Sequence, residues 1–132
     1  MIDIMPDDKE ISKALNVLNS ISDKLRFWRI NMQEEEKVRI IAERYGYEPQ
    51  SRQCIEEMSE LTQAINKLWR KQNFGGNSRE IAEAHENVLE EIADVLIMIW
   101  QMKELLGIGE GELSRIINQK LDRQLERIYS KN

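Results

Sequence analysis

Two short acidic stretches, EEMSE and EEIAD, each place two carboxylates three residues apart. The first contains Glu57 and Glu60, and the second contains Glu91 and Asp94. Residues three apart share one face of a helix, with Cβ atoms roughly 5–6 Å from each other, so each pair gathers charges that repel. A divalent cation relieves this repulsion, and ligands that are all carboxylate oxygens favour Mg²⁺ or Mn²⁺. The four side chains are therefore predicted to bind Mg²⁺, with Mn²⁺ as the alternative ion.

Asp94 lies inside an almost continuous apolar run, from Ile92 to Trp100. Such a run is normally buried on most sides of a helix. An unpaired carboxylate in that environment is costly in free energy or stays protonated. We therefore expect the run to be buried and Asp94 to share a metal ion with the three glutamates.

The acidic pairs also have a simpler interpretation. In a chain with 24 acidic residues, one pair at this spacing often lies on an ordinary solvated helix face. Two pairs on neighbouring helices leave both interpretations open. A di-iron centre is not expected, because it requires Glu-x-x-His in a helical bundle. His85 is the only histidine, and Ala82 stands three residues before it.

The elements predicted to position these carboxylates are all helices. Apolar residues recur at three- and four-residue spacing, and runs of alternating β-branched and aromatic residues between turns are nearly absent. The short loop NFGGNS makes the third and fourth helices antiparallel neighbours, which brings the two acidic pairs to one interface. The expected helices span about residues 8–28, 33–44, 49–72, 77–106 and 112–129.

Composition and charge exclude several classes of protein. The 132 residues, 41% apolar and 33% charged, suit one domain over residues 1–132. The net charge of −5 argues against nonspecific binding to nucleic acid, and the longest apolar run is too short to span a membrane. The single Cys54 excludes an intrachain disulfide framework, and the acidic N-terminus does not resemble a signal peptide. Both features indicate the reducing cytoplasm.

The stretches IEEMSELTQAI and LEEIADVLIMI resemble the MazG-like, all-α nucleoside triphosphate pyrophosphohydrolases. That superfamily includes dimeric dUTPases and phosphoribosyl-ATP pyrophosphohydrolases. Its pattern is E-E-x-x-E on one helix and E-x-x-D on the next. The matching residues are Glu56, Glu57, Glu60, Glu91 and Asp94.

The resemblance covers about residues 39–128, and the spacing between its two motifs is at the long end for the family. Residues 1–36 are either a first helix like that of the family or an N-terminal helical extension of this chain. The resemblance implies an all-α, four- to five-helix bundle of the MazG-like type. The fourth predicted helix is apolar around nearly its whole circumference, so we expect a homodimer or homotetramer to complete the bundle.

The resemblance also implies an activity, the hydrolysis of a (d)NTP to a (d)NMP and pyrophosphate for nucleotide-pool housekeeping. Mg²⁺ would bridge the carboxylates and the phosphates. Glu56 lies off the face of the metal ligands, which suits a general base or an outer-shell ligand as well as it suits a solvent-facing residue. The alternative to an enzyme is a non-catalytic helical module that binds a nucleotide or a metal ion.

Basic and amide side chains are candidates for contacting such a substrate. Lys67 lies on the acidic face of its helix, and Asn87 lies one turn before Glu91. Lys120 and Arg123 belong to a basic strip on the last helix, where the family commonly places phosphate-binding residues. An ordinary solvated strip is an equally good interpretation of these last two residues.

Overall fold

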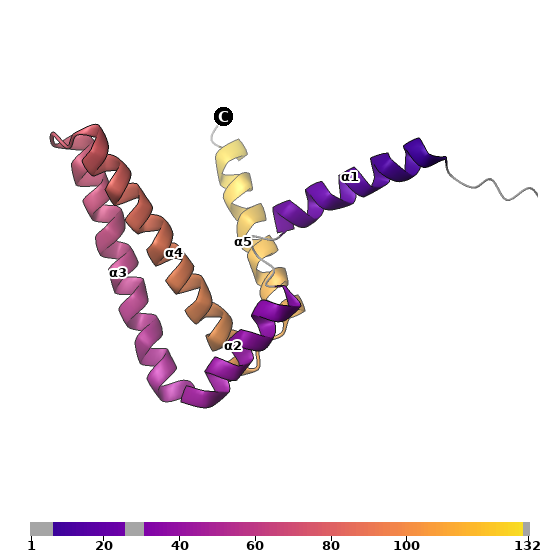
Figure 1. The fold of residues 1–132 in the computed structure, drawn as a ribbon, viewed down its shortest axis with the longest axis horizontal. Coiled ribbons are helices and arrows are strands. Elements are labelled where there is room, and N and C mark those ends of the chain that lie inside the picture. Colours follow the sequence, from indigo (N-terminus) through magenta and orange to yellow (C-terminus); the bar gives the residue numbers. More distant parts are fainter. Residues whose placement is uncertain (1–6, 26–30, 131–132) are drawn as a thin grey trace, which may run out of the picture. The chain divides into compact units, whose positions relative to one another are not determined.

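The structure is a computed structural model that describes residues 7–25 and 31–130, with side chains described for residues 7–20 and 31–130. Within these ranges the chain is all-helical and contains no strand, which confirms the predicted fold class at this level (Figure 1). The helices are α1 (Asp8–Leu25), α2 (Met32–Tyr45), α3 (Tyr47–Asn73), α4 (Ser78–Leu106) and α5 (Glu110–Ser130).

The helix boundaries agree with the predicted ones to within two residues wherever both can be compared. α3 begins at Tyr47, before Pro49, because a proline in the first turn of a helix removes no intrahelical hydrogen bond. The predicted end of the first helix, near residue 28, lies outside the described residues.

The chain divides into two compact units, Met1–Lys37 and Val38–Asn132. In the first unit, Asp7 caps α1 by accepting a hydrogen bond from the Glu10 N–H at 2.7 Å, and the Glu10 carboxylate accepts one from the Asp7 N–H at 3.3 Å. This reciprocal arrangement is a capping box. α2 begins inside the first unit and continues into the second, which holds the remaining three helices.

Asn77 caps α4. The Asn77 side chain accepts a hydrogen bond from the Glu80 N–H at 2.9 Å. The Glu80 carboxylate does not complete a capping box, because it pairs with Lys71 of α3 at 2.5 Å. The hydrogen bond and the charge of Lys71 lower the pKa of Glu80.

The two glycines of the α3–α4 loop serve different purposes. Gly75 has a φ of +85°, a conformation that L side chains rarely adopt. A Cβ atom on Gly76 would lie 2.5 Å from the Lys71 carbonyl oxygen, which accepts a hydrogen bond from the Gly76 N–H at 3.0 Å. The chain therefore reverses tightly, and α3 and α4 form the predicted antiparallel hairpin.

Two polar pairs fix the register of this hairpin. Near its open end, Gln50 Nε2 donates a hydrogen bond to Gln101 Oε1 at 2.6 Å, and near the loop Lys71 meets Glu80. Counting twenty-one residues forward from Gln50 and twenty-one back from Gln101 gives Lys71 and Glu80, so both pairs have the same register.

That register places the two acidic motifs opposite each other. A step of seven residues from the Gln50–Gln101 pair sets Glu57 opposite Asp94. A step of ten residues sets Glu60 opposite Glu91. The hairpin alone therefore accounts for the approach of the two motifs.

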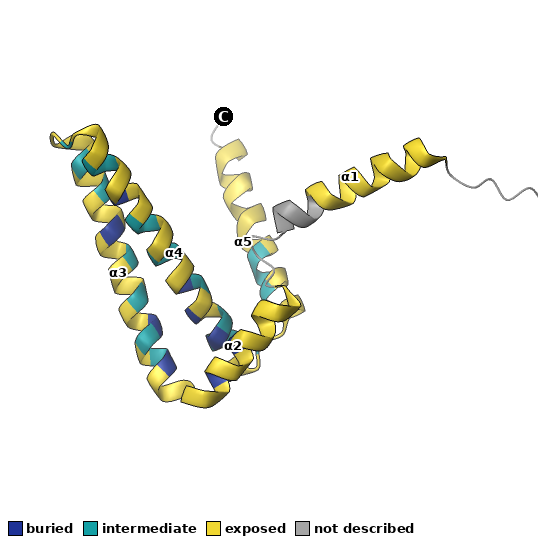
Figure 2. Cartoon of the chain, viewed as in Figure 1, coloured by how far each residue is buried: buried dark blue, intermediate teal, exposed yellow. Residues whose placement is uncertain are grey.

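The core of the described chain is small. Of the described helices, only α3 and α4 have backbones that run closely side by side. Figure 2 shows the buried residues mainly along these two helices, and α5 contains none. The buried apolar residues are Val38, Ala42, Cys54, Ala64, Ala84, Val95 and Met98.

Large apolar side chains remain exposed on all four helices that lie wholly or partly in the second unit. The largest set lies on the outer faces of the hairpin and along α5. No helix of the described residues combines the length and apolar character that crossing a membrane requires. The exposed side chains include Ile55, Met58, Ile65, Leu89, Ile97, Ile99, Leu121, Leu125 and Ile128.

Candidate metal centre

Glu57 occupies an interface position of α3. Gln50 and Ala64 stand seven residues before and after it, and both are buried. A spacing of seven residues is close to two helical turns, so the three side chains form one row facing α4. The Glu57 side chain is half-buried in the middle of that row.

Glu91 occupies the equivalent position of α4. Ala84 and Met98 stand seven residues before and after Glu91, and both are buried. Glu91 itself is half-buried. Each helix therefore contributes one carboxylate to a row whose other members are alanine, methionine or glutamine.

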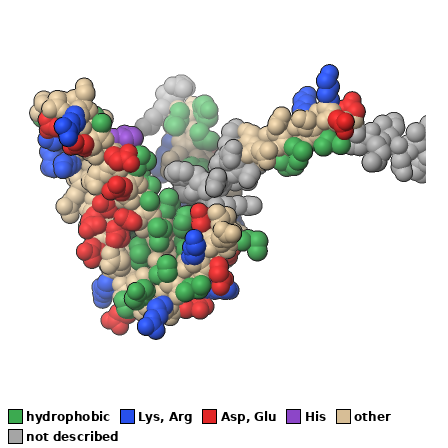
Figure 3. Space-filling view, viewed as in Figure 1, with side chains coloured by type: hydrophobic (Ala, Val, Ile, Leu, Met, Phe, Trp, Pro, Cys, Tyr) green, Lys and Arg blue, Asp and Glu red, His purple; other side chains and the backbone are tan. Residues whose placement is uncertain are grey.

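Glu57, Glu60 and Glu91 converge on one small volume. One carboxylate oxygen of each residue lies within 4.8 Å of the corresponding oxygen of the other two. Two oxygens on one Mg²⁺ ion are about 3 Å apart when adjacent and about 4 Å apart when opposite, so side-chain rotations that draw these oxygens together would make all three its ligands. Acidic side chains gather along this hairpin beside apolar ones in Figure 3.

Two oxygens of this cluster are buried without a hydrogen-bond donor. They are Glu57 Oε2 and Glu91 Oε2. A buried carboxylate oxygen that has lost water and found no donor raises the free energy of the folded state. A cation between the three side chains would supply the missing interaction, and the residues present therefore fit a hard divalent ion.

The pKa values of two members are raised by this crowding. The charge of Glu57 is the largest cause of the raised pKa of Glu60, followed by a hydrogen bond with the Glu57 carboxyl group, by burial, and by the charges of Glu91 and Glu56. Burial is the largest cause of the raised pKa of Glu91, followed by the charges of Asp94, Glu57 and Glu90.

Asp94, the fourth predicted metal ligand, is not part of the converging group. It is exposed, and it is not one of the three residues whose oxygens lie within 4.8 Å of one another. The expected burial of the apolar run is wrong for a single chain, because α4 packs closely on α3 alone among the described helices and Ile97 and Ile99 remain exposed. Asp94 is nevertheless close enough for its charge to raise the pKa of Glu91.

The residues predicted to act as the general base or to bind the substrate differ in their placement relative to the cluster. Glu56 is exposed next to Glu57. Lys67 is exposed on α3 two turns beyond Glu60, and Asn87 is half-buried on α4 one turn before Glu91.

Lys120 and Arg123 are exposed on α5, whose backbone does not run close to either helix of the hairpin. Lys67 and Asn87 thus lie on the two helices that carry the carboxylates, whereas Lys120 and Arg123 lie on a helix that does not run beside them.

The structure adds one residue that the sequence analysis did not single out. Gln53 Nε2 donates a hydrogen bond to Glu57 Oε1 at 2.6 Å. The spacing of four residues between Gln53 and Glu57 is a signal that could have indicated this contact, because such residues are neighbours on a helix.

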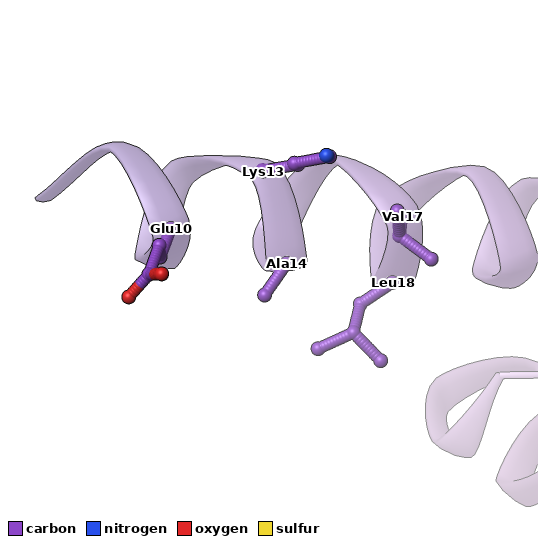
Figure 4. Close-up of a pocket in the computed structure, with 5 residues that line it drawn as sticks. All are labelled: Glu10, Lys13, Ala14, Val17 and Leu18. Atoms are coloured by element: carbon purple, nitrogen blue, oxygen red, sulfur yellow. The ribbon is translucent and has the colours of Figure 1, made fainter. Parts of the chain in front are cut away.

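The carboxylate cluster is open to solvent on one side, because Glu60 is exposed and Glu57 and Glu91 are only half-buried. Shallow hollows lie elsewhere, one along α5 and one along α1, and each is lined by residues of a single helix. Neither contains a residue of the cluster. The α1 hollow, shown in Figure 4, is lined by Glu10, Lys13, Ala14, Val17 and Leu18.

No model of a known protein family, no curated protein and no solved structure matches this chain. Its function is therefore inferred from the carboxylate cluster and from the acidic motifs that form it.

Proposed function

We propose that this protein is a Mg²⁺-dependent nucleoside triphosphate pyrophosphohydrolase of the MazG-like type, which hydrolyses a (d)NTP to a (d)NMP and pyrophosphate in nucleotide-pool housekeeping. The observation that carries the proposal is the convergence of Glu57, Glu60 and Glu91 at the α3–α4 interface, with two buried oxygens that lack donors. The resemblance of both acidic motifs to that family supports it.

The roles of the carboxylates follow from their positions. Glu57, Glu60 and Glu91 hold the metal ion, and Asp94 completes the set from the exposed side of α4. When bound there, Mg²⁺ neutralises the charge of a triphosphate and lowers the pKa of a bound water. Glu56 accepts a proton from the attacking water, because it is exposed beside the ligands and does not face into the cluster.

The substrate is held by cationic and amide groups around the cluster. Lys67 binds phosphate oxygens from the loop side of the carboxylates, and Asn87 donates a hydrogen bond to the sugar or the base. Lys120 and Arg123 add positive charge from α5 of the same chain or of a partner copy. The exposed apolar faces of the hairpin and of α5 support assembly into a homodimer or homotetramer. The proposed enzyme acts in the cytoplasm.

Release of pyrophosphate from a panel of common and modified NTPs and dNTPs tests this function. We expect release with Mg²⁺ or Mn²⁺ and none with EDTA. Glu60→Gln should reduce turnover by at least about 100-fold, because it removes a charged ligand without changing the side-chain volume. Glu86→Gln, at an exposed position of α4 outside the cluster, is the matched control and should leave turnover unchanged.

A non-catalytic helical module is the competing function. The exposure of Glu60, which leaves the cluster open to solvent, is the observation that favours this alternative. A protein that binds Mg²⁺ and nucleotide but releases no pyrophosphate from any member of the panel would establish the module and refute the enzyme.

A further inference from the structure

Gln53 makes the only side-chain hydrogen bond that the structure records to a member of the carboxylate cluster from outside it, within the described residues. Its amide Nε2 lies 2.6 Å from Glu57 Oε1, and both side chains are half-buried. Hydrogen bonds to an ionised acceptor are shorter and stronger than neutral ones. This contact therefore restricts the rotation of the Glu57 carboxylate.

The two oxygens of the Glu57 carboxylate have different environments. Oε1 accepts the hydrogen bond from Gln53, whereas Oε2 is buried and has no donor. A glutamate side chain without such a bond samples several rotamers, and some of these turn its carboxylate away from α4.

The chemistry of glutamine suits this position. A lysine or arginine there would neutralise Glu57 and compete with a cation. A second glutamate would add to the repulsion that already raises the pKa of Glu60. A neutral amide donates a hydrogen bond and leaves the full negative charge of Glu57 available.

We propose that Gln53 is a positioning residue, which holds Glu57 with one oxygen free for the metal ion that this site binds. The inference rests on the proposed metal centre, and it assigns to Gln53 no contact with substrate or metal. Ligands of metal sites commonly depend on such hydrogen-bonded partners, whose loss weakens metal binding about 10- to 100-fold.

Mn²⁺ titration of the full-length chain, followed by the electron paramagnetic resonance signal of free Mn²⁺, tests the inference without reference to activity. Gln53→Met keeps the side-chain length and removes the donor. We expect this variant to bind Mn²⁺ about 10- to 100-fold more weakly than the original chain. Gln63→Met, at an exposed position of α3, is the matched control and should bind normally.

A second background separates positioning from a general loss of structure. Glu57→Asp withdraws the carboxylate from Gln53 by one methylene group. If Gln53 acts through Glu57, then Gln53→Met should change Mn²⁺ affinity less than about twofold in that background, because coupled residues are not additive. Circular dichroism confirms that each variant is helical, and Gln53→Ala repeats the measurement if Gln53→Met is not.

The results that overturn the inference differ from those that overturn the enzymatic function. Normal Mn²⁺ affinity in Gln53→Met, or equal losses in both backgrounds, refutes positioning even if pyrophosphate is released. Failure of the unsubstituted chain to bind Mn²⁺ also refutes it. Gln53-dependent Mn²⁺ binding without pyrophosphate release supports positioning and refutes the enzyme.

Discussion

The carboxylates of this site are held together against their mutual repulsion. The charge of Glu57 raises the pKa of Glu60, and burial raises the pKa of Glu91. Both effects arise because the folded chain places charged groups close together and away from water. At the scale of single residues, the cluster is therefore stabilised by whatever positive species enters it, whether a proton or a metal ion.

This competition predicts a pH-dependent stability in the absence of metal. The pKa values of Glu60 and Glu91 are raised above the ordinary value of 4.5, so between that pH and the raised values the folded state binds more protons than the unfolded state. The resulting stabilisation is full below pH 4.5 and is lost as the pH rises through the raised pKa values.

Thermal unfolding in EDTA at several pH values measures this effect. Glu60→Gln mimics the protonated side chain, so this variant should melt at a higher temperature than the original chain near pH 7. The difference should vanish as the pH approaches 4.5, where the glutamate is itself protonated. A difference in melting temperature between the two proteins that stays constant with pH would contradict the prediction. Glu86→Gln is the control for the loss of one surface charge.

At the scale of elements, the hairpin register determines which carboxylates meet. The pairs Gln50–Gln101 and Lys71–Glu80 share one register, and the acidic motifs lie between them. Gln101 is only 2% exposed, and its remaining contact is a weak hydrogen bond from Nε2 to Met98 Sδ at 3.7 Å. The Gln50 amide is therefore its principal partner.

Loss of one member of the glutamine pair should be worse than loss of both. Gln50→Leu leaves the buried Gln101 carbonyl without a donor and should lower the free energy of unfolding by about 1–3 kcal/mol. The double variant Gln50→Leu/Gln101→Leu removes both polar groups and should be closer to the original chain. Urea denaturation of the two single variants and the double variant forms the cycle that measures this. A double variant that equals the sum of the singles would contradict the prediction.

The sequence was sufficient to predict the helices and the hairpin, because apolar periodicity, the Asn77 cap and a short glycine loop are local signals. It was also sufficient to bring Glu57, Glu60 and Glu91 together, since antiparallel helices with acidic pairs near their middles must juxtapose them. It did not predict the Gln53 contact, which depends on side-chain rotamers. The predicted burial of Asp94 is not found in the single chain, because periodicity does not reveal how many neighbours a helix has.

At the scale of the whole molecule, many large apolar side chains of the second unit remain exposed in the single chain. An exposed apolar stripe runs along α5 and consists of Leu121, Leu125 and Ile128, and α5 has no buried residue. The outer faces of the hairpin also have large exposed aliphatic side chains. Exposed apolar patches of this kind mark interaction surfaces. The positions of Lys120 and Arg123 relative to the carboxylates could not be predicted, because they depend on how α5 packs.

Self-association is therefore expected through these surfaces. Light scattering should give a mass of two or four times the 15.6 kDa of one chain. Leu125→Glu places a charge in the exposed stripe of α5 and should shift the protein towards the monomer. Gln124→Glu, on the neighbouring exposed position, adds the same charge outside the stripe and should not. A monomer in the original chain would contradict this expectation.

The single thiol of the chain is a probe of local opening around α3. Cys54 is buried on α3, one turn before Met58, and burial raises its pKa. Both conditions slow its reaction with an alkylating reagent, since the thiolate is the reactive form. The rate at which iodoacetamide labels Cys54 thus measures how often the structure around α3 opens. An ion that joins α3 to α4 should slow that labelling, and no label has to be engineered into the protein.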